Sequence, residues 1–376
     1  MAVEQSRKFA GKIELKLKVP LNSSDDLSTA YTPGVAQVCR EIAADEKESF
    51  NLTWRKNSIA VLTDGSAILG LGNLGPAAAM PVMEGKAAIF KKFGNVDAVP
   101  ICVSTQDPDE ICFIAKNLQK TFGGINLEDI SAPRCFEIEK RLSEDLEIPV
   151  FHDDQHGTAI VVLAGILNAL KIVGKKLENC KIVFSGAGAG GISTARLLIA
   201  AGARNLILVD SRGAIYADRD NLNPAKESMC KFNRENLSGS LTKVLRGADI
   251  FVGLSAPNLL IADDIKTMNS DPIVFAMANP DPEILPDEAK RGGAAVVATG
   301  RSDFENQANN ALVFPGIFRG VFDAGAREFS PEVFLIAARA LADCVENPRP
   351  EEILPAVFDP NPHEKIAVAV RDFFRN

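Results

Sequence analysis

Short apolar runs alternate with amphipathic segments along the first part of this chain. Residues 58–63, 98–103 and 148–151 are brief, rich in Ile and Val, and flanked by turn residues, which is typical of buried strands. Between them, residues 109–120 and 132–146 carry apolar side chains at helical spacing. Strands that alternate with helices in this way predict an α/β unit built on a parallel sheet.

The same alternation resumes after a strongly apolar helix predicted over residues 158–173. Strands are predicted at 181–185, 205–209, 249–254, 273–277 and 294–299, with helices at 192–201, 241–246, 262–268 and 286–291. The polar residues 218–240 are predicted to be a flexible insertion, and the chain from Ser330 onward is mostly helical. The pattern predicts two α/β units, residues 1–155 and 156–376, the second being a Rossmann-type doubly wound parallel sheet with a C-terminal helical segment.

The stretch 181–210 contains the parts of a dinucleotide-binding site in order. A strand leads into Gly186-Ala187-Gly188-Ala189-Gly190-Gly191, and an apolar helix follows. The glycines permit a tight turn and a close approach of backbone to a pyrophosphate, which binds at the helix N-terminus. Asp210 follows Gly191 by 19 residues, where a carboxylate can hold the ribose 2′-hydroxyl. We expect NAD, because Asp210 would repel a 2′-phosphate, but Arg212 could turn to accept one, so NADP is the alternative.

A second glycine-rich match, Gly70-Leu-Gly72-Asn-Leu-Gly75, lacks this context. Pro76 and Pro81 fall in the stretch that would have to form the phosphate-binding helix, and no second strand ending in an acid follows at once. We interpret it as a turn after the strand 58–63.

Composition narrows the class of protein. A net charge of -8 gives no basic face for nucleic acid, and 46% hydrophobic with 24% charged residues fits a soluble globular chain. Seven scattered cysteines without a C-x-x-C pair argue against disulfides or a thiolate zinc site and predict a reducing cytoplasm. The N-terminus lacks the apolar core of a signal peptide, and the apolar stretch 158–170 is too short to span a bilayer, so no membrane association is expected.

Two acid pairs follow predicted strands: Glu128-Asp129 and Asp153-Asp154. Ligands collect at the carboxyl ends of parallel strands, and carboxylates without cysteine suit Mg²⁺ or Mn²⁺. A single Asp before a helix is more often a cap, but two pairs in one short span favour a metal site. His152 and His156 are not favoured as ligands, because the change from strand to helix separates their faces and the other groups are oxygens.

Lys86 and Tyr31 are the remaining reactive candidates. Lys86 lies in an apolar segment, where lost solvation would lower its pKa and allow it to act as a base. A snorkelling lysine whose ammonium reaches water is the alternative, and sequence alone favours it. Tyr31 lies in a turn, and alone it would be a packing residue.

Together these residues resemble the malic enzyme family, in its short bacterial type, from about residue 27 to about residue 318. The similar motifs are residues 28–36 around Tyr31, 63–73, 83–86, 126–129, 152–158, 278–280 and 309–316. The resemblance implies that Glu128, Asp129 and Asp154 bind the metal. It also implies that Lys86 is the general base and Tyr31 the general acid, with Asp153 among the catalytic residues. Asn279 and Asn310 would hold the substrate carboxylates.

The implied reaction is the metal-dependent oxidative decarboxylation of L-malate to pyruvate and CO₂, with reduction of NAD(P), in a homodimer or higher homo-oligomer. Three alternatives are conversion of malate to lactate with retained NAD, a 2-hydroxy-acid dehydrogenase that stops before decarboxylation, and a non-catalytic dinucleotide sensor. One departure from the family pattern is Ala67, which stands where larger members carry a substrate-contacting arginine. Either another cation replaces that arginine, or the asparagines and the metal suffice.

Overall fold

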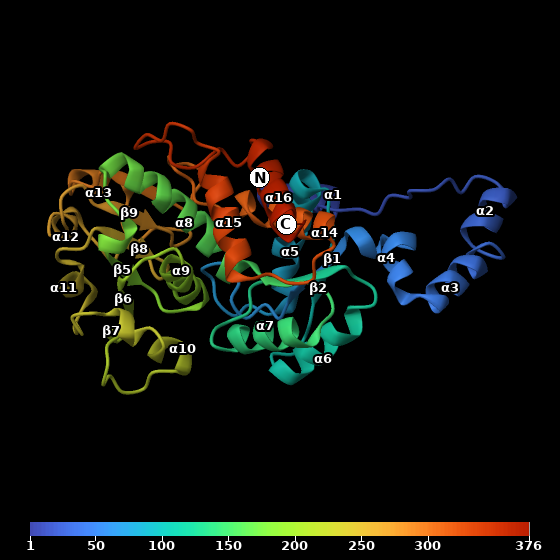
Figure 1. The fold of residues 1–376 in the computed structure, drawn as a ribbon, viewed down its shortest axis with the longest axis horizontal. Coiled ribbons are helices and arrows are strands. Elements are labelled where there is room, and N and C mark those ends of the chain that lie inside the picture. The colour runs from blue at the N-terminus through green and yellow to red at the C-terminus, as the bar shows by residue number, and fades with distance from the viewer. Residues whose placement is uncertain (376) are drawn as a thin grey trace.

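The computed structural model describes residues 1–375, in which a parallel sheet and a largely parallel sheet organise the chain (Figure 1). The first sheet has the strand order β2-β1-β3-β4 and is parallel throughout. Its strands are β1 (Ser58–Thr63), β2 (Asp97–Cys102), β3 (Gly124–Leu127) and β4 (Val150–His152), connected through α5 (Pro76–Gly94), α6 (Pro108–Leu118) and α7 (Arg134–Asp145). These strands and helices confirm the elements predicted for the first unit.

The second sheet has the order β10-β9-β8-β5-β6-β7. Its strands are β5 (Lys181–Ser185), β6 (Asn205–Asp210), β7 (Gly213–Ala214), β8 (Ile250–Gly253), β9 (Ile273–Ala276) and β10 (Val296–Thr299), with the helices α9 (Ala189–Ala200), α10 (Pro224–Glu227), α11 (Leu241–Leu245), α12 (Ala262–Ile265) and α13 (Pro286–Arg291). Only the short β7 pairs antiparallel. Because β5 lies between β6 and β8, the strand order reverses there, which is where doubly wound sheets bind dinucleotides.

The helix α8 (Asp153–Val173) joins the two units and begins directly after β4. It starts before the predicted residue 158, and its 21 residues are long and apolar enough to cross a bilayer. The helix is therefore longer than the apolar stretch 158–170 that the prediction considered. Its apolar surface is instead covered by protein: 67% of its most apolar window is buried, with α9 and α15 (Pro331–Ala342) packed on it.

The C-terminal helices return to the first unit. α14 (Phe314–Ala324) packs against α5, and α16 (Asn361–Arg375) packs on α14. The Phe318 ring lies 5.3 Å from that of Phe90 and 5.7 Å from that of Phe151, between centroids. The largest apolar cluster therefore contains residues from both units.

Two local expectations need correction. Pro76 and Pro81 do not prevent a helix, because α5 forms over both. Pro76 occupies the first turn, where no backbone N–H donor is needed, whereas Pro81 lies inside the helix. The segment 218–240, which was expected to be a flexible insertion, instead holds α10 and the 3-10 helix η4 (Cys230–Phe232) and buries Met229 and Asn233.

The N-terminal segment forms an arm. It contains α1 (Ala2–Phe9), α2 (Ser24–Ala30) and α3 (Val35–Ala44), then η1 (Glu46–Glu48), α4 (Ser49–Leu52) and η2 (Trp54–Asn57). Figure 1 shows α2 and α3 projecting well away from both sheets. Between residues 1 and 48 no residue is buried, although Leu15, Leu17 and Leu27 are large apolar side chains.

Candidate functional site

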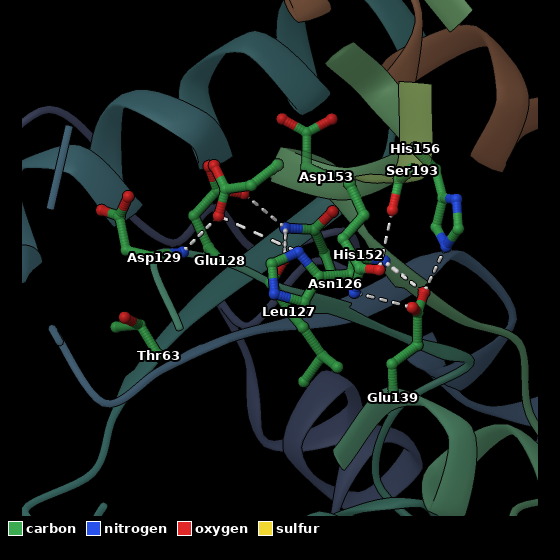
Figure 2. A network of polar contacts seen from close by, with 12 residues as sticks. Thr63, Asn126, Leu127, Glu128, Asp129, Glu139, His152, Asp153, His156 and Ser193 are labelled. Carbon is green, nitrogen blue, oxygen red and sulfur yellow. Dashed lines mark hydrogen bonds and ion pairs between the residues drawn. The ribbon is translucent and has the colours of Figure 1, made fainter. Parts of the chain in front are cut away.

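The carboxyl ends of β3 and β4 bring the predicted acids together. These strands are adjacent and parallel, with Leu127 opposite His152, so the residues that follow each strand meet at one sheet edge. Glu128, Asp129 and Asp154 each offer a carboxylate oxygen, and the three oxygens lie within 4.8 Å of one another. Figure 2 shows Glu128 and Asp129 side by side at this edge.

The chemistry of this cluster fits a hard divalent cation. Asp129 has a left-handed backbone (φ 54°), and its N–H donates to Oδ2 of Asp154 at 2.9 Å. Its own Oδ2 is buried and has no hydrogen-bond partner within residues 1–375. Burial, and then the neighbouring carboxylates, raise the pKa of Asp129 to about 7; burial also holds the pKa of Glu128 well above its usual range. Crowded oxygen ligands with one orphaned acceptor match the donor set that Mg²⁺ or Mn²⁺ prefers.

Lys86 extends from α5 into this cluster. Its Nζ lies 2.5 Å from Oδ2 of Asp153 and 3.0 Å from Oε1 of Glu128, and only 7% of the side chain is exposed. Burial alone would lower the pKa of Lys86, but Asp153 and Glu128 outweigh it and raise that pKa above its ordinary value. The snorkelling interpretation and the lowered pKa were therefore both wrong. Lys86 is an ion-paired ammonium whose pKa will fall when positive charge is placed beside Asp153 and Glu128.

Asp153 connects Lys86 to one of the predicted substrate asparagines. Nδ2 of Asn310, which begins η5 (Asn310–Leu312), donates to the same Oδ2 that holds Lys86. Gly157 makes this arrangement sterically feasible, because a Cβ there would lie 2.0 Å from Oδ1 of Asp153. Sequence reasoning missed that requirement, which arises only once α8 begins at Asp153.

The loop of the other asparagine, Asn279, is exposed and follows β9. A Cβ at Gly70 would lie 2.0 Å from the carbonyl oxygen of Asn279, so the second glycine-rich stretch permits close approach of two loops. Glu283, which sequence reasoning missed, is fully buried and accepts hydrogen bonds from the N–H groups of Ser255 (2.9 Å) and Ala278 (3.0 Å). This carboxylate therefore ties the loops after β8 and β9 together, directly before Asn279.

The β5–α9 turn has the geometry predicted for a dinucleotide. Gly186 has φ 111°, and a Cβ at Gly191 would lie 2.1 Å from the Gly186 carbonyl oxygen, so both positions require glycine. Ala187 and Gly188 continue the turn, and Gly188 is the N-cap of α9 with open space where a Cβ would be. A Cβ at Gly190 would be 3.3 Å from the Asp154 carbonyl oxygen, which places this turn beside the carboxylate cluster.

Asp210 ends β6 as predicted, and it is held by two cationic side chains that sequence reasoning did not single out. Arg212 contributes only its backbone N–H, at 2.9 Å. Nη2 of Arg219 and Nζ of Lys226 each lie 2.7 Å from an Asp210 oxygen. Burial raises the pKa of Asp210, but Lys226 and the other donors outweigh it and hold that pKa below the ordinary value. Arg219 and Lys226 lie in the polar segment 218–240, whose sequence gave no sign of this contact.

Tyr31 is not part of the cluster within one chain. It caps α2 in the projecting arm, its side chain is 65% exposed, and Figure 1 shows α2 far from α5.

Ala67 donates its N–H to the Asp129 carbonyl at 2.9 Å. A cationic side chain does reach the loop that carries Ala67: Nη2 of Arg134 lies 3.0 Å from Oδ2 of Asp64.

Two of the three histidines, His156 and His363, make their contacts outside the carboxylate cluster. Nε2 of His156 lies 2.7 Å from Oε1 of Glu139, and its ring stacks on Phe334. His363 stacks on Phe93, and burial lowers its pKa to about 4.

Comparisons with known proteins give consistent matches over most of the chain. Two family models match, "Malic enzyme, N-terminal domain" over residues 10–143 and "Malic enzyme, NAD binding domain" over residues 155–373. The chain is 56% identical to an NAD-dependent malic enzyme of Geobacillus stearothermophilus, covering 96% of this chain and 76% of that protein. It is 50% identical to a bifunctional malic/malolactic enzyme of Bacillus subtilis, covering 96% of this chain and 89% of that protein. The solved NAD-dependent malic enzyme of Thermotoga maritima is 46% identical, with a TM-score of 0.96 over 99% of both chains.

Proposed function

This chain belongs to the malic enzyme family, and on that premise we propose that it converts L-malate to pyruvate and CO₂ with reduction of NAD(P), in a reaction that requires Mg²⁺ or Mn²⁺. The observation that carries the proposal is the contact of buried Lys86 with Asp153 and Glu128, inside a three-carboxylate cluster beside the dinucleotide turn. A dinucleotide sensor would not need a buried base among metal ligands.

Each residue of the site receives a role from its position. Glu128, Asp129 and Asp154 would hold the divalent cation. When bound, the cation supplies Lewis acidity toward the C2 oxygen and the dinucleotide supplies the hydride acceptor. In its neutral form, Lys86 would accept the proton of the malate C2 hydroxyl, and Asp153 orients its Nζ. Asn310, tethered to Asp153, and Asn279 would hold the malate carboxylates.

The proton that C3 receives after decarboxylation would come from Tyr31, and we infer that Tyr31 acts on the site of a second copy of the chain. After CO₂ leaves, a general acid must protonate C3 of the product, and Tyr31 is the residue expected to do so. The arm that carries Tyr31 buries none of its first 48 residues, while it presents apolar side chains such as Leu15 and Leu27 to solvent. A homodimer in which each arm covers its partner would bury these side chains and complete both sites.

Mixed dimers test that arrangement. A dimer of one Lys86→Ala chain and one Tyr31→Phe chain contains one intact site if Tyr31 acts across the interface, and none if it acts within its own chain. We expect mixing the two inactive variants to restore activity. Mixtures that stay inactive, although mixed dimers are isolated, would place Tyr31 in its own subunit.

The reaction itself is tested by following NAD and NADP reduction with L-malate and Mn²⁺, before and after EDTA, with pyruvate assayed in parallel. Metal-dependent reduction with equimolar pyruvate is expected. Lactate without net reduction would favour the malolactic activity that the Bacillus subtilis relative carries in its name. We also place the enzyme in a reducing cytoplasm, since all seven cysteines are free.

A further inference from the structure

Glu139 lies beside the point where β4 ends and α8 begins, and the proposed mechanism gives it no role. It projects from α7, and only 13% of its side chain is exposed. Its Oε1 accepts hydrogen bonds from the backbone N–H of His152 (3.1 Å) and from Nε2 of His156 (2.7 Å). Its Oε2 accepts a hydrogen bond from Nε2 of Gln155 at 2.9 Å. Figure 2 shows Glu139 below His152 and His156 in that view.

All three donors belong to the point where β4 becomes α8. His152 is the last residue of β4, while Gln155 and His156 lie in the first turn of α8. The same turn begins with Asp153, which pairs with Lys86, and Asp154, which belongs to the carboxylate cluster. Since His152 makes no side-chain cap at this helix, Glu139 supplies an acceptor that the helix N-terminus otherwise lacks.

Glu139 acts from the side of α8 that faces away from the carboxylate cluster. It lines a cavity of about 910 Å³ between α7, α9 and α15, and none of Lys86, Glu128, Asp129 or Asp154 lines that cavity. From the same side, Oγ of Ser193 in α9 donates to Oε1 of Gln155 at 3.0 Å. The dinucleotide-binding helix is thereby connected to Glu139 through a single side chain.

We propose that Glu139 is a positioning residue that fixes the first turn of α8, so that Asp154 and Asp153 are held in place for the divalent cation and for Lys86. The inference rests on the metal-dependent function proposed above. Groups that hydrogen-bond directly to metal ligands typically contribute about 10–100-fold to metal affinity or activity. Glu139 acts through the neighbours of Asp153 and Asp154, so we expect an effect at the lower end of that range.

Two conservative variants separate the hydrogen bonds of Glu139 from its charge. In Glu139→Gln, the new carbonyl can still accept from His152 and His156. The new NH₂ group then faces Gln155, whose amide can turn over because the Ser193 hydroxyl can accept as well as donate. Glu139→Asp keeps the charge but shortens the side chain by one CH₂ group, so its oxygens withdraw from all three donors.

The test is Mn²⁺ binding to the full-length protein without substrate, followed by electron paramagnetic resonance of free Mn²⁺. We expect Glu139→Asp to weaken Mn²⁺ binding by about tenfold or more, and Glu139→Gln to bind nearly as the parent does. Glu137→Asp is the matched control, since Glu137 lines the same cavity from the same helix but pairs only with Arg141. Thermal melting in EDTA confirms that each variant is folded.

Parent-like Mn²⁺ binding in Glu139→Asp would overturn the inference. Equal weakening in both variants would also overturn it, because the charge and not the hydrogen bonds would then be the cause. A parent protein that binds no Mn²⁺ would refute the metal-dependent function itself, and this inference with it.

Discussion

The carboxylate cluster should destabilise the protein whenever no cation is bound. Asp129 titrates at about 7 in the folded chain, against 3.8 for an ordinary Asp. A carboxyl whose pKa is raised by folding binds its proton more tightly in the folded state, so stability falls as pH rises between those two values. Above the upper value the full penalty is present, and at roughly 1.4 kcal/mol per pKa unit it amounts to about 4 kcal/mol.

Asp129→Asn removes that penalty and keeps the side-chain shape. Near pH 8 in EDTA, we expect the variant to be more stable than the parent by up to about 4 kcal/mol, or roughly 5 °C in melting temperature for a chain of this length. Near pH 5 the advantage should shrink to about 2 kcal/mol, because the parent carboxyl is then largely protonated. With saturating Mn²⁺ the order should reverse, since the cation stabilises only a folded state that can bind it.

The assay is thermal unfolding by circular dichroism under these three conditions. Asp145→Asn is the control, because Asp145 is half exposed at the end of α7 and is not one of the three clustered carboxylates, so its melting difference should not depend on EDTA. An Asp129→Asn variant that melts below the parent in EDTA near pH 8 would refute the claim that burial and carboxylate repulsion destabilise this site.

Other variants test single contacts. Lys86→Ala should abolish turnover while NAD binding, measured by calorimetry, survives; near-normal turnover would remove Lys86 as the base. Asp210→Ser frees Arg219 and Lys226 for a 2′-phosphate, so kcat/KM for NADP should rise relative to NAD by about tenfold or more, as one charge-assisted hydrogen bond is worth roughly 1.5–3 kcal/mol. An unchanged ratio would mean that these cations do not face the ribose. Glu283→Gln can accept from only one of its two backbone donors, which should cost about 1–3 kcal/mol of stability and raise KM for malate through the Asn279 loop. A KM equal to that of the parent would show that Glu283 does not position this loop.

Local sequence determined most strands of the two sheets and the edges of the sheets where the candidate ligand-binding residues lie. The β-branched runs set the strands, and the glycines from 186 to 191 set the turn before α9, because each property depends on residues adjacent in the chain. The acids that follow β3 and β4 could be assigned to one sheet edge for the same reason: parallel strands present their carboxyl ends together.

Only the tertiary structure decided which charges meet. Lys86 and Asp153 are 67 residues apart, and their contact depends on how α5 packs beside the β4–α8 junction. Arg219 and Lys226 reach Asp210 because an apparently structureless segment folds back on β6, and Glu139 reaches α8 from a separate helix. A lysine pKa is set by the carboxylates within a few ångströms of its Nζ, and periodicity along a chain carries no information about those distances.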